Sequence, residues 1–279
     1  MTFEDGIKLV QQAVEQGVNF FDTAPNYGNG NSEKILGIAL KERRNRVFIN
    51  TKVGHLPSGA TSFTSDGIKT SIHHSLKQLE TNYLDSAILH NPPHYILEGK
   101  TDAFDTMKSL KKAGLIKHYG VSIDTMDELR TTLENTDVDV IEIMFNMIHQ
   151  SPREFFEEVK ERKIILIIKI PLDSGWLSGK YDQESTFTGI RSRWSKEDIK
   201  QRADIVDMLK TIVGEEQFVQ KALAYVLSFD AVSVIIPGIK NEEQLSSNIA
   251  ASKVTLTKKQ IDSINKLYDS YIKTQNIPW

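Results

Sequence analysis

Four side chains that can hold charge or move a proton follow apolar runs of this 279-residue chain. The first run ends on Asp22, and Tyr27 follows five residues later in a loop rich in glycine and asparagine. Two later runs end on Lys52 and His90. Parallel strands end at one rim of a sheet, where loops can hold such side chains over a pocket. We therefore expect Asp22, Tyr27, Lys52 and His90 to form one proton-transfer site.

Strand and helix patterns alternate regularly and would position these four residues. Strands that alternate with helices indicate a parallel sheet, and continuous Val/Ile/Leu runs are typical of strands buried on both faces. The predicted strands are 18–23, 46–52, 84–90, 117–122, 138–145, 164–170 and 232–236. The predicted helices are about 4–17, 32–43, 66–80, 102–113, 126–134, 152–162, 195–211, 214–228, 241–251 and 257–271. Ser32 should cap the second helix.

A barrel and an open dinucleotide-binding sheet both fit this alternation. The open sheet would place Gly-x-Gly-x-x-Gly after an early strand. The nearest candidate, Gly28-Asn29-Gly30, lacks the third glycine at the right spacing and follows Tyr27. We therefore expect an α/β fold of the (β/α)8 TIM-barrel type, as one domain over residues 1–279.

The residues around Asp22 form a longer pattern that resembles a known family. Residues 21–33 read Phe-Asp-Thr-Ala-x-x-Tyr-Gly-x-Gly-x-Ser-Glu, which is close to diagnostic of the aldo-keto reductases. The catalytic tetrad of that family is Asp, Tyr, Lys and His, in this order. Further similar stretches are 117–122, 171–180 and 234–240, so the resemblance covers nearly the whole chain. It implies a barrel that uses NADP(H) to reduce a carbonyl to an alcohol.

The chain differs from the family pattern at its start. Family members begin with a short hairpin and a first barrel strand, whereas this chain begins with the helical pattern at 4–17. We therefore expect a barrel that lacks the N-terminal hairpin and the first strand. Unpaired strand edges are costly. The edges of strands 18–23 and 232–236 should be drawn together, covered by another segment, or joined to a second chain.

The tetrad divides the work of carbonyl reduction. Tyrosine is a weak acid with a pKa of about 10, and the ammonium of Lys52 should lower the pKa of Tyr27. Asp22 should pair with Lys52, because a buried ammonium is costly alone. His90 should orient the carbonyl or pass a proton to Tyr27. The hydride would come from a nicotinamide, since no side chain can donate one.

The resemblance also implies where the cofactor binds. The small-residue loop in 171–180 can direct N–H groups at a diphosphate, and the turn at 237–241 would hold the adenosine. Lys240 would favour NADP over NAD. Arg191 would clamp the diphosphate, or the polar segment 183–194 around it is a solvated connection. The implied set is Ser122, Glu142, Lys169, Leu172, Ser174, Gly175, Lys180, Arg191, Gly238, Lys240, Gln244 and Asn248.

Three positions near the expected nicotinamide depart from the family. Ser122 is followed by isoleucine where many members have Ser-Asn. Glu142 stands where many members have glutamine, and Lys169 stands where many have a stacking tyrosine. Glu142 and Lys169 lie on neighbouring predicted strands and could pair.

The composition excludes other classes. A net charge of −3 gives no electrostatic case for nucleic acid or an anionic membrane, and no apolar run is long enough to cross a bilayer. The absence of cysteine excludes disulfides and thiolate chemistry and fits a reducing compartment. The acidic start is unlike a signal peptide, so we expect a cytoplasmic protein. Strand ends with Lys and Tyr are unlike a carboxylate–histidine cluster, so we expect no metal.

The sequence therefore predicts an NADPH-dependent oxidoreductase that reduces a small aldehyde or ketone, with Tyr27 as the proton donor. Two alternatives stay open. A barrel of this kind could bind NADP(H) with little turnover, as a regulatory or truncated form. It could also be a sugar dehydrogenase that works mainly in the oxidative direction, since the same tetrad serves both directions.

Overall fold

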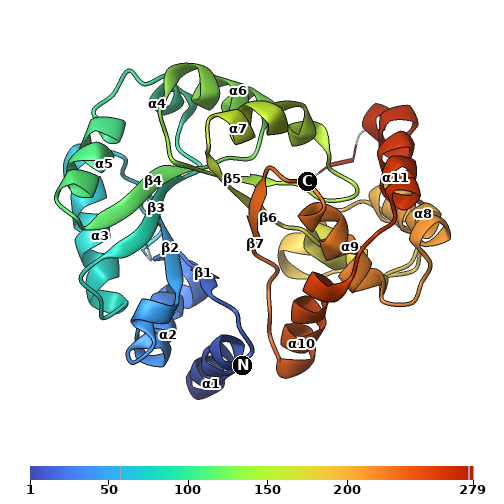
Figure 1. Cartoon of the computed structure of the whole chain (residues 1–279), viewed down its shortest axis with the longest axis horizontal. Coiled ribbons are helices and arrows are strands. Elements are labelled where there is room, and N and C mark those ends of the chain that lie inside the picture. Colours follow the sequence, from blue (N-terminus) through green and yellow to red (C-terminus); the bar gives the residue numbers. More distant parts are fainter. Residues whose placement is uncertain (57, 276, 279) are drawn as a thin grey trace. The chain divides into compact units, whose positions relative to one another are not determined.

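The computed structural model describes residues 1–56, 58–275 and 277–278. In these residues seven strands form one sheet in sequence order, β1 to β7 (Figure 1). Each neighbouring pair from β1 to β5 is parallel. The strands are β1 (Phe20–Asp22), β2 (Phe48–Val53), β3 (Leu84–His90), β4 (Ile116–Ser122), β5 (Val140–Met144), β6 (Ile165–Lys169) and β7 (Val232–Ile235).

The chain divides into two compact units, and each is described by itself. Unit 1 comprises Met1–Ile143 and Glu158–Ile167, and unit 2 comprises Met144–Glu157 and Ile168–Trp279. The expectation of a single domain over 1–279 stays a prediction.

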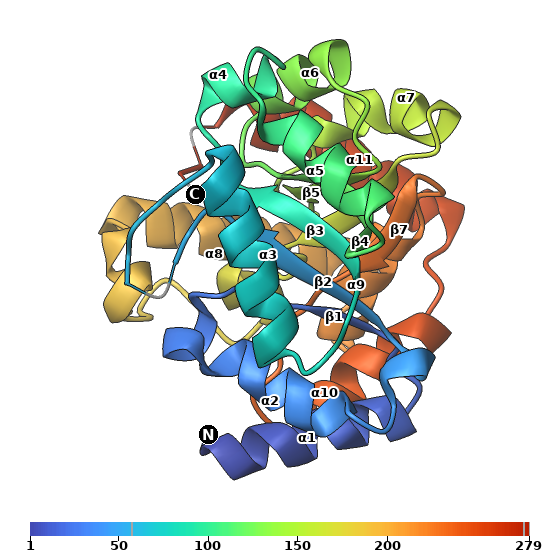
Figure 2. The same ribbon diagram turned by 90° about the vertical axis from the view of Figure 1, so that its left-hand side faces the viewer.

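Unit 1 holds strands β1 to β4, most of β5, the first part of β6 and the helices beside them. Helix α3 packs against β2 and α5 against β4, and α3 also contacts α2 and α5 (Figures 1 and 2). Threonines set helix starts: Thr2 and Thr125 form capping boxes, which satisfy free N–H groups of the first turn. The helices are α1 (Phe3–Glu15), α2 (Asn31–Leu40), α3 (Ser65–Gln78), α4 (His94–Leu97), α5 (Ala103–Lys112) and α6 (Met126–Asn135).

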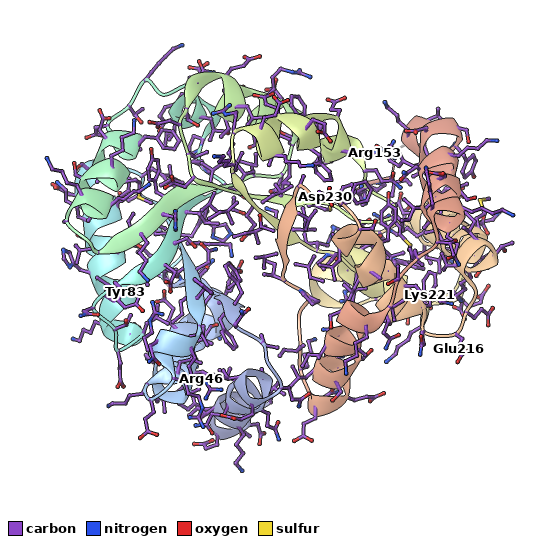
Figure 3. The ribbon with its side chains drawn as sticks, viewed as in Figure 1. Arg46, Tyr83, Arg153, Glu216, Lys221 and Asp230 are labelled. Atoms are coloured by element: carbon purple, nitrogen blue, oxygen red, sulfur yellow. The ribbon has the colours of Figure 1, made fainter. Side chains whose placement is uncertain are left out.

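Unit 2 holds β7 and four longer helices. Helix α9 packs against β7, and Ile236 donates its N–H to the carbonyl of Ile168 at 3.1 Å. Arg153, labelled in Figure 3, binds both carboxylate oxygens of Asp269 at 2.7 and 2.9 Å. The helices are α8 (Lys196–Val213), α9 (Phe218–Leu227), α10 (Glu242–Ala250) and α11 (Lys258–Ser270). Helix α7 (Phe156–Glu161) connects the two units along the chain.

Every predicted strand overlaps an observed one, and β3 has the predicted bounds. The helix predicted at 152–162 is instead a 3₁₀ turn, η3 (Ser151–Phe155), followed by α7, and α4 was not predicted. Ser32 does not cap α2, because the helix already begins at Asn31 after the left-handed Gly30. The Ser32 hydroxyl instead lies 2.8 Å from that of Thr23.

We expected a barrel without its N-terminal hairpin and first strand, and the residues that bear on this lie at the start of unit 1. Helix α1 comes before β1, and the part of the chain that the structure describes has no strand before Phe20. Strand β7 is only half-buried over most of its length. The expected covering of the edges of β1 and β7 stays a prediction.

Candidate active site

Three strand ends of unit 1 bring the predicted proton-transfer residues together. Asp22 and His90 are the last residues of β1 and β3, and Lys52 is the last but one of β2. Tyr27 opens the 3₁₀ turn η1 (Tyr27–Gly30), which comes shortly after β1. The three residues after Tyr27 have positive φ angles of 57°, 55° and 83°. Glycine and asparagine are the residues that tolerate this conformation, so the loop composition fits its shape.

Lys52 lies in a buried ion cluster with two carboxylates. Its ammonium contacts Asp22 and lies 3.2 Å from Oε2 of Glu142. The exposed fractions of these side chains are 1% for Lys52, 9% for Asp22 and 2% for Glu142. Asn50 donates to the second oxygen of Asp22 at 2.7 Å, and the Ser122 hydroxyl donates to Oε1 of Glu142 at 2.9 Å. The cluster is thus fixed from four strands, β1, β2, β4 and β5.

Tyr27 and His90 complete the group. The ammonium of Lys52 lies 5.2 Å from the ring centroid of Tyr27. The rings of Tyr27 and His90 meet edge to face, with centroids 6.0 Å apart. Tyr27 is 37% exposed, whereas the ion cluster beside it is buried. The arrangement therefore places a partly exposed tyrosine beside a buried cation.

The electrostatics of the cluster differ from the sequence-based expectation. Burial alone would lower the pKa of Lys52, but the carboxylates of Asp22 and Glu142 raise it well above its ordinary value. Burial raises the pKa of Tyr27. Lys52 lowers it, and the two carboxylates raise it again, so that the net pKa is raised. Lys52 thus lowers the pKa of Tyr27 as expected, but burial, which the sequence analysis did not count, together with the two carboxylates outweighs this effect.

A second histidine, which the sequence analysis did not single out, lies beside His90. The rings of His55 and His90 are 4.9 Å apart between centroids, at 72°. Nε2 of His55 lies 2.8 Å from the carbonyl oxygen of His90, and since a carbonyl only accepts, this nitrogen must donate. Gly54 has a φ of 113°, and Phe63 lies where a Cβ would stand. The loop after β2 thus folds back over its own strand end. The signal in the sequence that could have indicated His55 was its position, three residues after Lys52.

In unit 2, the predicted diphosphate loop has an unusual backbone. Asp173, Ser174 and Gly175 have successive φ angles of 45°, 53° and 98°. Non-glycine residues in this region are strained and need support. The buried carboxylate of Asp173 supplies it, with Arg202 Nε and His149 Nε2 each at 3.3 Å. Burial would raise the pKa of Asp173, but His149 and Arg202 hold it below its usual range.

Arg191 lies against this loop. A Cβ on Gly175 would stand 3.5 Å from Nη2 of Arg191 and 3.2 Å from the ring of Tyr181. Nη1 of Arg191 donates to the Tyr181 hydroxyl at 2.8 Å. Phe187 and Trp194 both pack on Trp176, with ring centroids 5.5 and 5.9 Å apart. Segment 183–194 is therefore anchored on the loop by aromatic packing.

The other predicted cofactor residues of unit 2 lie as follows. Gln244 accepts from the backbone N–H of Lys240 at 2.9 Å, and Asn248 donates to the carbonyl of Gly238 at 3.5 Å. Asn241 caps α10, and the Lys240 side chain is exposed. Leu172 and Ser174 are half-buried and Lys180 is exposed. Lys169 ends β6 and is half-buried, and its pairing with Glu142 of unit 1 stays a prediction.

Comparison with known proteins decides the family. The model of the aldo/keto reductase family matches residues 1–269. The chain belongs to the aldo/keto reductase family. Members of this family reduce small carbonyl compounds with NAD(P)H.

A curated relative agrees with this assignment, and solved structures agree with the fold. The chain is 25% identical to an NADH-specific methylglyoxal reductase of Escherichia coli, over 90% of this chain and 83% of that protein. The aldo-keto reductase AKR11C1 from Bacillus halodurans (holo form) aligns with a TM-score of 0.83 at 23% identity, over 99% of this chain and 91% of that one. An aldo/keto reductase from Klebsiella pneumoniae, solved with NADP and acetate, has a TM-score of 0.72 at 20% identity, over 95% and 86%. The predicted (β/α)8 fold is thereby confirmed.

No helix in the described part of the chain has the length and apolar character needed to cross a membrane. The predicted cytoplasmic location stays a prediction.

Proposed function

We propose that this chain is an NADPH-dependent aldo-keto reductase that reduces an aldehyde or ketone to an alcohol, with Tyr27 as the proton donor. The observation that carries the proposal is the buried ammonium of Lys52, held by two carboxylates, beside a tyrosine that is 37% exposed. An accessible acid next to a buried, fixed charge is what general acid catalysis requires.

Each side chain of the cluster has a proposed task. Tyr27 would give its proton to the carbonyl oxygen, and Lys52 would stabilise the tyrosinate that remains. Asp22, fixed by Asn50, would hold Lys52 in place. His90, edge-on to Tyr27, would donate a hydrogen bond that orients the carbonyl. A bound nicotinamide would supply the hydride.

The residues of the chain fit a dinucleotide cofactor. Glycine at position 175 lets the loop lie close to Tyr181 and Arg191, because a Cβ there would stand only 3.2 Å from the ring of Tyr181. A guanidinium beside a loop of small residues is suited to a diphosphate. We assign the diphosphate to Leu172, Ser174, Gly175, Lys180 and Arg191. We assign the adenosine to Gly238, Lys240, Gln244 and Asn248, and the nicotinamide amide to Ser122, Glu142 and Lys169.

The choice of cofactor is the first test. Lys240 should bind the 2′-phosphate of NADPH by a charge-assisted contact worth roughly 1.5–3 kcal/mol, which NADH cannot form. Lys240→Ala should remove most of the preference for NADPH, measured by titrating each cofactor and following its fluorescence. Lys258→Ala removes another exposed lysine of unit 2, one that pairs with Asp262, and should leave the preference unchanged. Equal affinity of the unaltered protein for NADPH and NADH would contradict the assignment.

The second test is turnover. Purified protein with NADPH should oxidise the cofactor when members of a panel of small aldehydes and ketones are added. Binding of NADPH without turnover on any carbonyl would favour the alternative of a cofactor-binding barrel with little activity. Faster reaction of sugars with NADP⁺ than of carbonyls with NADPH would favour a sugar dehydrogenase.

A further inference from the structure

The backbone carbonyl of His90 lies where the pairing of two strands stops. Strand β2 pairs with β3 up to Val53. Asn91, the residue after His90, donates its N–H to the carbonyl of Ser122 on β4 at 2.9 Å. The C=O and N–H groups of one trans peptide point in opposite directions, so the carbonyl of His90 points toward β2. A regular continuation of β2 would direct the backbone N–H of His55 at this carbonyl.

The chain instead turns away at Gly54 and returns the side chain of His55 to the same carbonyl. Gly54 has a φ of 113°, and the backbone of His55 pairs with Thr61 in an antiparallel bridge. Ser62 closes this loop by donating its N–H to the carbonyl of Gly54 at 2.9 Å. Nε2 of His55 donates to the carbonyl oxygen of His90 at 2.8 Å. The imidazole therefore takes the place of a backbone donor.

Aromatic contacts connect the same loop to the proposed proton donor. The ring centroids of Phe63 and His55 are 6.0 Å apart, those of His55 and His90 4.9 Å, and those of His90 and Tyr27 6.0 Å. All three contacts are edge to face, so each ring limits how the next one can turn. The half-buried carbonyl of His90 needs only a water or a short donor to be satisfied. Satisfying this carbonyl therefore does not by itself require a histidine.

We propose that His55 is a positioning residue that acts on the substrate carbonyl through His90. Its hydrogen bond fixes the backbone at the end of β3, from which the His90 side chain starts, and thereby holds the imidazole against the ring of Tyr27. The catalytic meaning of this inference rests on the proposed function, in which His90 orients the carbonyl and Tyr27 protonates it. In such a site a misplacement of about 1 Å can cost about 10²-fold in rate.

Three replacements of His55 separate the hydrogen bond from the ring. His55→Gln keeps an N–H donor of similar reach without the ring, His55→Phe keeps a ring without the donor, and His55→Ala removes both. We expect the turnover number per folded molecule to fall at least about tenfold in the alanine and phenylalanine variants and to stay within about threefold in the glutamine variant. NADPH affinity should be unchanged in all three, because His55 acts on the carbonyl side of the reaction.

His73→Ala is the matched control. His73 is an exposed histidine of α3 in the same unit. Its removal should leave both the turnover number and the affinity for NADPH unchanged. The phenylalanine variant serves in place of the alanine variant if the latter does not fold.

A measurement without turnover keeps this inference distinct from the proposed function. Nuclear Overhauser contacts between the ring protons of His90 and Tyr27, recorded on the free protein, report whether the two rings stay together. They should persist in the glutamine variant and be lost in the alanine and phenylalanine variants. Survival of these contacts in the latter two, or their loss in the glutamine variant, would overturn the inference.

Kinetics and ring contacts together show which of the two proposals fails. The expected pattern of ring contacts in a chain that reduces no carbonyl would uphold the positioning by His55 and contradict the proposed function. Carbonyl reduction at the same turnover number in all the His55 variants would overturn the inference and leave the proposed function in place.

Discussion

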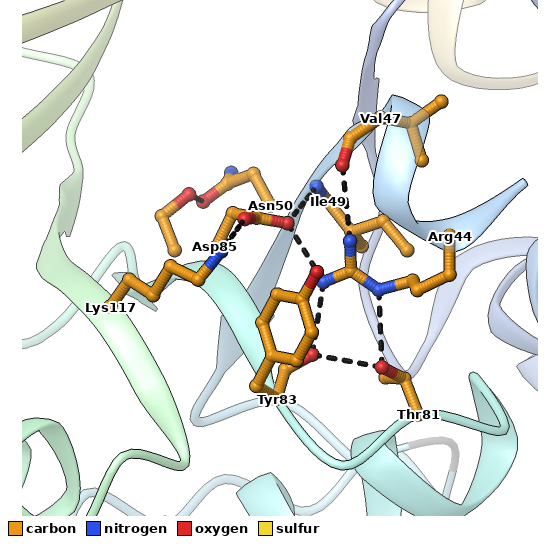
Figure 4. A network of polar contacts seen from close by, with 9 residues as sticks. Arg44, Val47, Ile49, Asn50, Thr81, Tyr83, Asp85 and Lys117 are labelled. Carbon is orange, nitrogen blue, oxygen red and sulfur yellow. Dashed lines mark hydrogen bonds and ion pairs between the residues drawn. The ribbon is translucent and has the colours of Figure 1, made fainter.

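Two ion clusters of unit 1 lie near opposite ends of strand β2. The start cluster consists of Arg44, Asp85 and Lys117 around Tyr83, where β2, β3 and β4 begin (Figure 4). Asp85 accepts from Arg44 at 2.7 Å, from Lys117 at 2.9 Å and from the backbone N–H of Ile49 at 3.0 Å. Both cations also lie over the ring of Tyr83, at 4.0 and 4.1 Å from its centroid. These contacts tie three strands together.

The end cluster consists of Asp22 and Lys52, near the ends of β1 and β2, and Glu142 in the middle of β5. It reverses the charge pattern, since one cation meets two carboxylates. Its cation also faces Tyr27, which can exchange a proton with another molecule because it is partly exposed. A buried ion pair alone therefore does not mark a functional site. The accessible, titratable group beside it does, at the strand ends where barrel enzymes carry their chemistry.

The largest effect on stability should follow from opening the start cluster. Asp85→Ala leaves the half-buried guanidinium of Arg44 without its carboxylate, and we expect the free energy of unfolding to fall by about 2–4 kcal/mol, toward the lower end of the cost of breaking a buried pair. Urea unfolding at neutral pH measures this. The end cluster is untouched, so turnover per folded molecule should be unchanged.

Lys117→Ala is the control for Asp85→Ala. Lys117 binds the same carboxylate, but its side chain is 53% exposed, so its loss should cost no more than about 1 kcal/mol. If both variants lower the free energy of unfolding equally, the pair of Asp85 with Arg44 does not dominate the start cluster. That result would contradict the structural role that we give to this cluster.

A smaller effect should come from a third carboxylate, that of Glu33 on α2, which contacts β2. Glu33 accepts from Thr51 and forms no ion pair with any described residue, and burial raises its pKa. The folded state therefore binds the proton more tightly than the unfolded chain. The stability that this provides is fully present below the unfolded pKa and is lost as the pH rises through the folded pKa. Glu33→Gln, which stays neutral, should remove this loss.

The measurement is the free energy of unfolding of both proteins across that pH range. Their difference isolates Glu33 from other titrating groups, including Asp173, whose pKa is shifted in the opposite direction. Parallel pH profiles for the two proteins would contradict the role of burial at Glu33.

The sequence predicted what depends on local pattern. Apolar β-branched runs placed all the strands, and residues at their ends placed Asp22, Lys52 and His90. Contacts between strands that are not neighbours in the sheet leave no such local signal. The contact of Glu142 with Lys52 is of this kind, and so is the burial of Tyr27, which is the main cause of its raised pKa.

The geometry of the loops could likewise not be predicted from the sequence pattern. His55 reaches His90 because the loop after β2 folds back at Gly54, and nothing in the local composition indicated that turn. The start cluster joins Arg44, Asp85 and Lys117 from three separate segments and gave no motif. Strands β1 and β7 belong to different units, and the expected covering of their edges stays a prediction.

The most direct test of the end cluster as a proton-transfer site is the turnover number of Tyr27→Phe, compared with its affinity for NADPH. The account predicts a fall in carbonyl reduction of roughly 10²–10⁴-fold, the usual contribution of a general acid. NADPH affinity should be nearly unchanged, and the free energy of unfolding should stay within about 0.5 kcal/mol, since only one partly exposed hydroxyl is removed. Turnover within a few-fold of the unaltered protein would show that the proton comes from another group and would contradict the account.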